Sequence, residues 1–296
     1  MRLVVLLGPT GVGKTDLCID VAKALHSSVV SCDSRQIYKE MRIGTAVPSQ
    51  EQLQAVPHFF IQSRSVFEPC DAWQFEHDAM AKIEELFATG SDDVVMCGGS
   101  MMYIDAVCKG IDEAPSIPGE LRDELMQRFR EEGLEPFRQE LKLLDPVFYE
   151  QVDLNNTQRV IHAVEVCRVA GVPYSSLRKK SVKKRDFDIV KIGLNRDREE
   201  LYDRINLRVD QMVDEGLVEE ARALFEYREL NALNTVGYRE LFDHFAGKIE
   251  FDEAIRLIKR NSRHYARKQL TWFKRDEEIH WFHPDEKDAI FNLLGV

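Results

Sequence analysis

Short apolar runs alternate with amphipathic stretches along the first hundred residues. Residues 3–7 (LVVLL), 28–32 (SVVSC) and 93–97 (DVVMC) are brief and rich in β-forming side chains, which is typical of strands buried on both faces. Between them, the spacing of apolar positions predicts helices over about 15–25, 34–41, 48–55 and 72–89. Strands that alternate with helices through short loops predict a parallel, doubly wound α/β sheet.

The pattern changes after residue 110. Pro115 and Pro118 indicate a linker, and the segments 119–144 (broken near Gly133) and 154–169 have amphipathic helical patterns. Strands are predicted at 187–194 and 279–282, and helices at 197–215, 217–228, 250–275 and the C-terminus. We therefore expect a core domain formed by residues 1–111 and 187–296, with a helical insertion domain at 112–186.

Composition narrows the class of protein without naming a function. With 44% apolar and 31% charged residues, the 296-residue chain can bury a sizeable core. No apolar run approaches the roughly 20 residues that span a bilayer, so we expect no membrane association. The six cysteines are scattered, without the spacing of a metal site or a disulfide framework, and this favours a reducing cytoplasm.

A glycine-rich motif follows the first predicted strand and precedes a helix. It consists of Gly8, Pro9, Thr10, Gly11, Val12, Gly13, Lys14 and Thr15, with the spacing of a Walker-type phosphate loop. Backbone N–H groups of such a loop converge on phosphate oxygens, Lys14 adds a positive charge, and the Thr15 hydroxyl is placed to bind Mg²⁺. The fold class predicted is thus a P-loop-type doubly wound sheet with a helical insertion domain.

The acid that a P-loop kinase uses to hold Mg²⁺ is missing at the expected strand end. The third strand runs into Cys97-Gly98-Gly99-Ser100, and Asp33, after the second strand, is the one well-placed acid. Because ligands bind beyond the carboxyl ends of parallel strands, we expect Asp33 and Ser100 to face the phosphate site. The alternative for Asp33 is a cap for the predicted helix at 34–41.

Positive charge is concentrated in one predicted helix, although the net charge of −11 by itself argues against a nucleic-acid partner. No acid lies between Glu253 and Asp276, and the segment holds eight cations: Arg256, Lys259, Arg260, Arg263, Arg267, Lys268, Lys274 and Arg275. A second basic run comprises Arg178, Lys179, Lys180, Lys183, Lys184 and Arg185. Two such runs favour a polyanion such as nucleic acid, and the alternative is a pair of solvated charged faces. Arg204 and Arg208 either face the phosphate site or pair with nearby acids.

Taken together, these motifs resemble the tRNA dimethylallyltransferase family over essentially the whole chain. The resemblance rests on GPTGVGKT (8–15), DSRQIY (33–38), IGTA (43–46), GGSMMY (98–103), NNTQRVIHAVEV (155–166), NTVGYRE (234–240) and RKQLTWFK (267–274). Many enzymes share the phosphate loop, whereas the elements at 33–38 and 269–273 are more specific.

The resemblance implies a prenyl transfer, in which the exocyclic amine of the adenine 3′ of the tRNA anticodon attacks dimethylallyl diphosphate. It implies that the residues of the phosphate loop, with Arg204, hold the diphosphate, that Lys14, Thr10 and Ser100 assist, that Thr15 binds Mg²⁺, and that Asp33 takes up the proton. The implied tRNA contacts are Asp33, Ser34, Arg35, Gln36, Ser100, Arg122, Gln158, Arg159, Val160, Ile161, His162, Asn234, Thr235, Val236, Gly237, Tyr238, Arg239, Arg263, Arg267, Lys268, Gln269, Thr271, Trp272 and Lys274. We expect a cytoplasmic monomer that binds the anticodon stem-loop of tRNA.

Two alternatives stay open at this point. One is a P-loop kinase or phosphotransferase that binds ATP, since the loop alone does not identify its phosphates. The other is a catalytically silent tRNA-binding paralogue, because His162 stands where the family usually has Arg and Val47 where it usually has Lys. The phosphate-loop residues and Asp33 match the family pattern.

Overall fold

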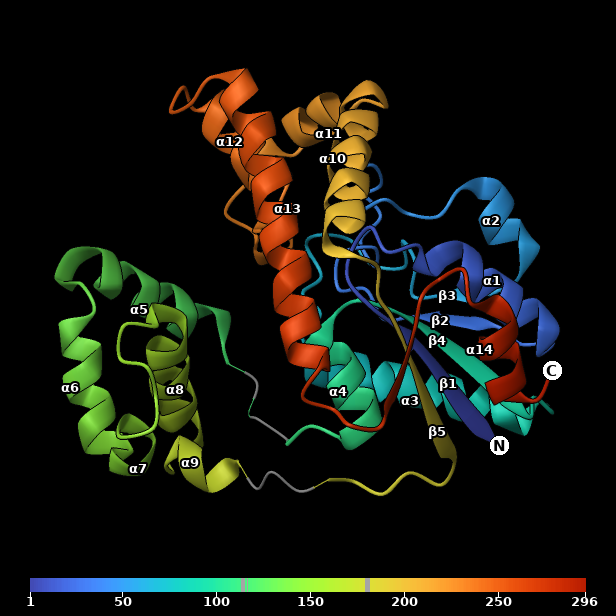
Figure 1. Ribbon diagram of the computed structural model, residues 1–296. Coiled ribbons are helices and arrows are strands. Elements are labelled where there is room, and N and C mark those ends of the chain that lie inside the picture. Colours follow the sequence, from blue (N-terminus) through green and yellow to red (C-terminus); the bar gives the residue numbers. More distant parts are fainter. Residues whose placement is uncertain (113–114, 116, 179–181) are drawn as a thin grey trace. The chain divides into compact units, whose positions relative to one another are not determined.

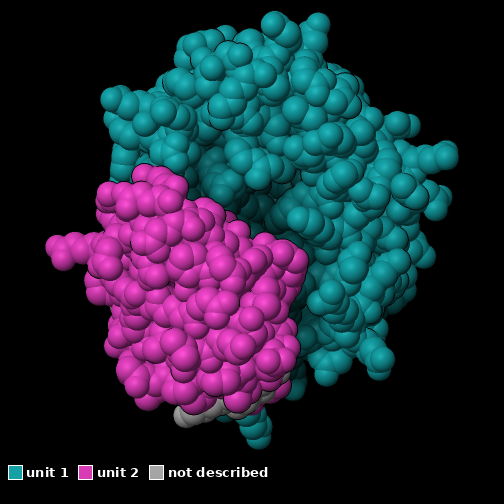
Figure 2. Space-filling model, turned by 90° about the vertical axis from the view of Figure 1, so that its left-hand side faces the viewer, with its two compact units in different colours: residues 1–109, 184–296 teal, residues 110–183 magenta. Residues whose placement is uncertain are grey.

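The computed structural model describes residues 1–112, 115, 117–178 and 182–296. They form two compact units: unit 1 contains residues 1–109 and 184–296, and unit 2 contains residues 110–183 (Figure 2). The insertion predicted at 112–186 corresponds to unit 2 with its boundaries shifted by a few residues.

Unit 1 is built on one parallel sheet of six strands in the order β3-β2-β4-β1-β5-β6 (Figure 1). The strands are β1 (Arg2–Leu7), β2 (Val29–Ser31), β3 (His58–Phe59), β4 (Asp93–Gly98), β5 (Asp188–Leu194) and β6 (Ile279–Phe282). The predicted α/β class is therefore confirmed, and the short edge strand β3 is an addition to the predicted elements.

Helices accompany the sheet and extend beyond it. Those of unit 1 are α1 (Lys14–Ala24), α2 (Gln50–Ala55), α3 (Ala72–Ala88), α4 (Met101–Lys109), α10 (Arg198–Asp214), α11 (Leu217–Ala223), α12 (Tyr238–Phe245), α13 (Phe251–Phe273) and α14 (Lys287–Leu294), with 3-10 turns at Phe225–Tyr227 and Asn231–Leu233. Those of unit 2 are α5 (Gly119–Glu132), α6 (Glu135–Leu144), α7 (Pro146–Tyr149), α8 (Thr157–Ala170) and α9 (Tyr174–Leu177). Within the described part of the chain, no helix is both long and apolar enough to cross a bilayer.

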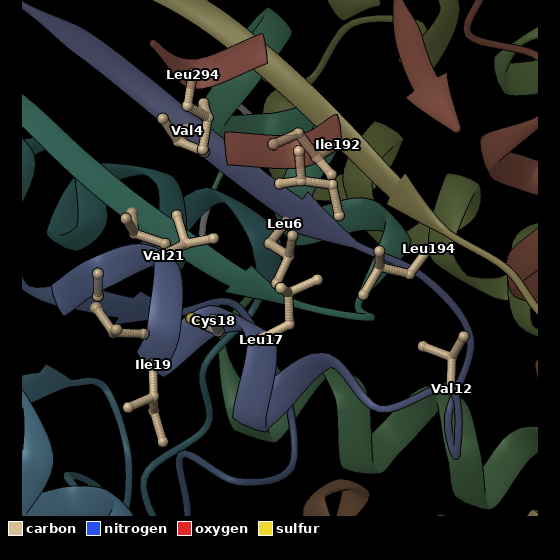
Figure 3. Close-up of a cluster of buried hydrophobic side chains, with 14 of the residues drawn as sticks. Val4, Leu6, Val12, Leu17, Cys18, Ile19, Val21, Ile192, Leu194 and Leu294 are labelled. Carbon is tan, nitrogen blue, oxygen red and sulfur yellow. The ribbon is translucent and has the colours of Figure 1, made fainter. Parts of the chain in front are cut away.

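The interior strand β1 is apolar from Leu3 to Leu7 because both of its faces are covered. Val4 and Leu6 pack with α1 and α14 on one face, as Figure 3 shows, whereas Leu3, Val5 and Leu7 pack with α3 and α4 on the other. Successive strand side chains point to opposite faces, so each alternate set fills a different core. This burial fixes the position from which the phosphate loop emerges.

The prediction of a helix over 34–41 is wrong. The segment forms turns and an isolated bridge between Tyr38 and Arg64. Backbone N–H groups of Gln62 and Ser63 donate to the carbonyls of Gln36 (2.8 Å) and Ile37 (2.9 Å), and these tertiary hydrogen bonds take the place of helical ones. The apolar spacing that suggested a helix instead places Ile37, Tyr38 and Met41 in a core cluster with α10–α13.

Unit 2 has a hydrophobic core of its own. Leu125, Phe137, Leu141 and Val160 are each fully buried within it. The Asp145 carboxylate is also fully buried, and it accepts hydrogen bonds from the Phe148 and Ser175 backbone N–H groups and from the Ser175 hydroxyl. These three donors satisfy the buried carboxylate, as a stable interior requires.

Candidate active site

A cavity of about 870 Å³ lies at the carboxyl ends of β1, β2 and β4. Most of the residues predicted for the phosphate site line it. They are Thr10, Gly11, Gly13, Lys14, Thr15, Asp33 and Arg204, and Gln36 and Gln269 join them. This is the edge at which ligands bind in parallel sheets.

The phosphate loop has the backbone conformation that its glycines allow. Gly11 and Gly13 have φ values of 80° and 102°, in the left-handed region that favours glycine. Gly13 immediately precedes α1, whose first N–H groups are unpaired within the helix and form an anion site. Val12 has no exposed surface and packs in the core, so its side chain anchors the loop.

Positive side chains surround this loop. The Lys14 ammonium donates to the carbonyls of Gly8 (3.0 Å) and Pro9 (2.8 Å), and Arg204 Nε donates to that of Gly11 (3.0 Å). Burial lowers the pKa of Lys14, while Cys97 and Asp33 raise it in part. A bound anion would offset the same desolvation, so the arrangement favours a negatively charged ligand.

Two further arginines lie at the loop. No sequence motif indicates Arg196, and the sequence leaves open whether Arg208 faces the phosphate site. Arg196 Nε donates to the Val12 carbonyl (2.9 Å), and Arg208 lines the cavity beside Asp33. Burial lowers the pKa of Arg208, and Asp33 opposes this change. The spacing of four between Arg204 and Arg208 was the available signal for the second, whereas nothing in the sequence pointed to Arg196.

Asp33 faces the cavity and also caps a turn. Its Oδ1 accepts hydrogen bonds from the backbone N–H groups of Arg35 (2.9 Å) and Gln36 (3.3 Å), and the residue lines the cavity. Asp33 therefore lies at the cavity, and what it caps is a turn, since the predicted helix does not form; this turn fixes the carboxylate beyond the end of β2.

Ser100 does not line this cavity, so the expectation for its side chain is wrong. Its hydroxyl accepts a hydrogen bond from the Ser34 N–H (2.7 Å) and donates to the Ser34 hydroxyl (3.0 Å). The side chain is 7% exposed because the chain turns into α4 directly after β4. Ser100 thus stabilises the segment that carries Asp33.

Gln269 joins α13 to the phosphate loop, although the sequence suggested a tRNA contact. Its Oε1 accepts from the Thr10 N–H (2.9 Å), its Nε2 donates to the Gly99 carbonyl (2.8 Å), and the residue is 2% exposed. Both ends of its amide are thereby used within the protein, so the side chain holds the phosphate loop and the Gly99 backbone to α13.

Replacing Gln269 should weaken both the fold and the site. Gln269→Ala leaves the Thr10 donor and the Gly99 acceptor unpaired, and we expect the free energy of unfolding to fall by about 2 kcal/mol. Chemical denaturation measures this loss, with the exposed Thr271→Ala on the same helix as the matched control. Equal stability of the two variants would contradict this role of Gln269.

A second cavity of about 450 Å³ brings together many residues predicted to contact tRNA. It is lined by Asp33, Ser34, Arg35, Asn234, Thr235, Val236, Gly237, Arg239 and Lys268, and it shares Thr10 and Asp33 with the first cavity. Segments about 200 residues apart in the chain therefore meet beside the phosphate site.

Four other predicted tRNA contacts are buried or engaged. Tyr238 has no exposed surface and donates its hydroxyl to Glu220 (2.6 Å), and Trp272 Nε1 donates to Asp105 (2.8 Å). Val160 and Ile161 belong to the core of unit 2. Each of these four residues lies in a helix next to an exposed residue. A motif of consecutive residues covers both the inner and the outer face of its helix, so only some of its side chains are exposed.

The remaining predicted residues of unit 2 lie on its surface. Gln158, Arg159 and His162 are at least partly exposed on α8, and Arg122 is exposed on α5. His162 Nδ1 lies 3.3 Å from Glu165 Oε2, and Arg122 Nε lies 3.5 Å from the other carboxylate oxygen. The histidine thus shares a buried carboxylate with a neighbouring arginine.

Two members of the basic run at 178–185 are engaged within the protein. The Arg178 guanidinium lies over the Phe148 and Tyr174 rings, and Arg185 pairs with buried Glu76 (2.6 Å). Lys179 and Lys180 lie outside the described residues. The structure therefore does not support a second basic patch made of the whole run.

The basic helix α13 is only partly committed to internal pairs. Arg256 pairs with Glu253 and Lys259 with Asp210, and Arg263 donates to Asn206. By contrast, Arg267, Lys268, Thr271 and Lys274 are exposed toward the C-terminal end of the helix. Exposed positive charge is therefore concentrated near the two cavities, which Lys268 and Gln269 line.

A parallel sheet whose first strand runs into a glycine-rich loop, with a strand-end carboxylate in the same cavity, is the arrangement of the P-loop-type α/β fold class. Residues 36–276 match the family described as IPP transferase. The chain is 58% identical over 293 residues to tRNA dimethylallyltransferase 2 of Parabacteroides distasonis, covering 99% of this chain and 98% of that protein. It is 54% identical over 294 residues to tRNA dimethylallyltransferase 1 of Bacteroides thetaiotaomicron, covering 99% and 95%.

Solved structures agree with these sequence comparisons. The full-length tRNA isopentenylpyrophosphate transferase of Bacillus halodurans is 34% identical, with a TM-score of 0.72 and coverage of 99% of this chain and 95% of that one. A eukaryotic dimethylallyltransferase acting on tRNA shares the fold, with a TM-score of 0.79 at 23% identity over 96% of this chain and 74% of its own. The protein belongs to the IPP transferase family, and the family predicted from the motifs is confirmed.

Proposed function

We propose that the protein transfers a dimethylallyl group from dimethylallyl diphosphate to the exocyclic amine of the adenine 3′ of the anticodon in tRNA, releasing diphosphate. The observation that carries this proposal is that the phosphate loop and Asp33 line one cavity, which adjoins a second one lined by Ser34, Arg35 and residues 234–239. The cavity at the phosphate loop and a second cavity of about 450 Å³ thus share one carboxylate.

Positive charge lies where the diphosphate of the prenyl donor would bind. Loop N–H groups, Lys14 and Arg204 would bind the diphosphate, and they would stabilise the negative charge that grows on it as the carbon–oxygen bond breaks. The adenine nitrogen forms the new carbon–nitrogen bond and loses a proton. Asp33, the carboxylate common to both cavities, would accept that proton.

Magnesium fits this donor site only as a companion of the diphosphate. Among the described residues, no group of three or more His, Cys, Asp or Glu side chains could hold a metal ion alone. Mg²⁺ commonly uses few protein oxygens and completes its shell with phosphate oxygens and water, and the Thr15 hydroxyl suits that role. When bound, it would neutralise charge on the leaving diphosphate.

The acceptor end is served by exposed cations and by access to an unpaired base. Arg267 and Lys268 on α13 would contact the tRNA backbone near the second cavity. Extruding a base costs least in a single-stranded loop, which suits an adenine beside the anticodon. We further propose that the protein acts as a monomer in the cytoplasm, where its six free thiols would stay reduced.

Mass spectrometry of tRNA nucleosides tests the proposal. Purified protein is incubated with Mg²⁺, unmodified tRNA and dimethylallyl diphosphate, and we expect dimethylallyl adenosine in the digest only when all components are present. In a parallel arm with labelled ATP, phosphate transfer without any prenylated nucleoside would establish a phosphotransferase instead. Tight tRNA binding with neither product would establish a silent paralogue, for which His162 and Val47 are the motivating departures.

A further inference from the structure

The loop of residues 42–47 forms part of the wall of the large cavity. Ile43, Thr45, Ala46 and Val47 line that cavity, and Thr45 also lines the second one. The loop therefore borders both the space beside the phosphate loop and the space proposed to hold the adenine. Apolar Ile43 and Val47 give this wall the chemistry that suits the hydrocarbon part of a prenyl diphosphate.

One carboxylate on α11 holds the loop. Glu220 Oε2 accepts the N–H groups of Arg42 (2.9 Å) and Ile43 (2.8 Å), and Oε1 accepts the Gly44 N–H (2.9 Å). The Tyr238 hydroxyl also donates to Oε1, at 2.6 Å. Both carboxylate oxygens are thus used by donors, which is the capacity of an ionised carboxylate and exceeds that of an amide.

The conformation that Glu220 holds is not one the loop would adopt unaided. Ala46 has a φ of 49°, in the left-handed region that is unfavourable for residues other than glycine. A Cβ added at Gly44 would lie 2.7 Å from the Tyr238 ring, so the backbone is pressed against that buried side chain. From the other side, Gln36 Nε2 donates to the carbonyls of Thr45 (3.1 Å) and Ala46 (2.9 Å).

We propose that Glu220 is a positioning residue for the reaction, which sets the donor-cavity wall at residues 43–47 and thereby the length of prenyl chain that is accepted. The inference rests on the proposed function, because it takes a prenyl diphosphate as the occupant of the cavity. Glu220 touches neither cavity in its own right, so it acts through the loop. It was absent from the residues that the sequence motifs suggested.

Glu220→Gln is the informative change. The glutamine has nearly the same shape, but its NH₂ group would face backbone N–H donors that now bind a carboxylate oxygen. With the wall displaced, we expect KM for dimethylallyl diphosphate to rise by about 10-fold, less than the roughly 10²-fold that a misplacement of about 1 Å at the reacting atoms can cost. The preference for dimethylallyl over geranyl diphosphate, measured as a ratio of kcat/KM, should fall by a similar factor, while tRNA affinity measured without donor stays within about 2-fold.

Glu219→Gln is the matched control, because Glu219 is the exposed neighbour on the same helix. It should retain the donor KM and the chain-length preference of the wild type. Wild-type values in Glu220→Gln, or the same losses in Glu219→Gln, would overturn the inference. If the wild-type protein transfers no prenyl group at all, the proposed function fails first, and the two failures are thereby distinguished.

A second variant covers the case in which Glu220→Gln does not fold. Tyr238→Phe removes one of the four donors to Glu220 and keeps the buried ring. We expect a smaller rise in donor KM, about 3-fold, with the same direction of change in chain-length preference. A folded Tyr238→Phe protein with unchanged preference would overturn the inference as well.

Discussion

Turnover of an Asp33→Asn variant should fall by about 10²-fold or more, the usual scale for the loss of a positioned proton acceptor. The asparagine oxygen can still accept the N–H groups of Arg35 and Gln36, because Asn and Asp serve almost equally as caps. The turn should therefore persist while the proton acceptor is lost. Single-turnover transfer to an anticodon stem-loop measures the effect, and thermal unfolding checks that the fold is retained.

Two further variants, Asp33→Ala and Asp20→Ala, serve as comparisons for Asp33→Asn. Asp33→Ala loses both the cap and the acceptor, so it should be at least as slow as Asp33→Asn and also less stable. Asp20 lies on α1, where it pairs with Lys287, and Asp20→Ala should react at nearly the wild-type rate. Near-normal turnover in Asp33→Asn, with the fold intact, would remove Asp33 from the proton transfer and leave it the role of a cap.

Reversing charge at Arg267 and Lys268 should give the largest loss of tRNA affinity. These exposed residues stand next to Gln269 at the two cavities, and Arg267→Glu with Lys268→Glu replaces two attractions to phosphate by two repulsions. We expect Kd for tRNA to rise by at least about 10-fold, and the slope of log K against log salt to shrink by roughly 2, one for each phosphate that is no longer neutralised. Filter binding over a series of salt concentrations measures both quantities.

Arg256→Glu is the control for this reversal. It changes charge on the same helix, but Arg256 is already paired with Glu253 and lies a long way along α13 from Gln269. Its salt dependence should stay close to that of the wild type. Equal reductions of affinity in the two proteins would mean that the net charge of the helix, and no particular side chain, attracts tRNA.

The sheet could be predicted from the sequence because burial leaves a direct trace in the residues. An apolar run such as 3–7 follows from a strand covered on both faces, and the glycines at 11 and 13 follow from a loop with positive φ. The segment 34–41 was mistaken for a helix because its apolar spacing serves a core contact made by turns. Hydrogen bonds from residues 62 and 63 decide its conformation, and they are invisible in a local pattern.

The candidate site, like the fold, could be predicted from the sequence only in part. Motif positions indicated the loop and Asp33, whose chemistry is carried by the residue type itself, whereas the spacing of Arg204 and Arg208 left their position open; both line the cavity. The motifs could not separate exposed His162 from buried Ile161 one position earlier, or show that Gln269 holds the phosphate loop. The sequence does not indicate Glu220, because the residue binds backbone N–H groups that are distant along the chain. In the sequence it cannot be told from any other acidic residue on the surface of a helix.

The two ends of unit 2 meet, and this has a consequence for how such a protein can vary. A Cβ added at Gly110 would lie 2.5 Å from Lys183 Cγ, so the segment that begins at Gly110 and ends at Lys183 leaves and re-enters the chain at almost one point. For the rest of the chain, such a segment has the effect of a short turn. The entropy cost of closing it depends only weakly on the length of the inserted segment. Segments of different length or composition could therefore be exchanged at this joint while unit 1, with its phosphate loop, keeps its fold.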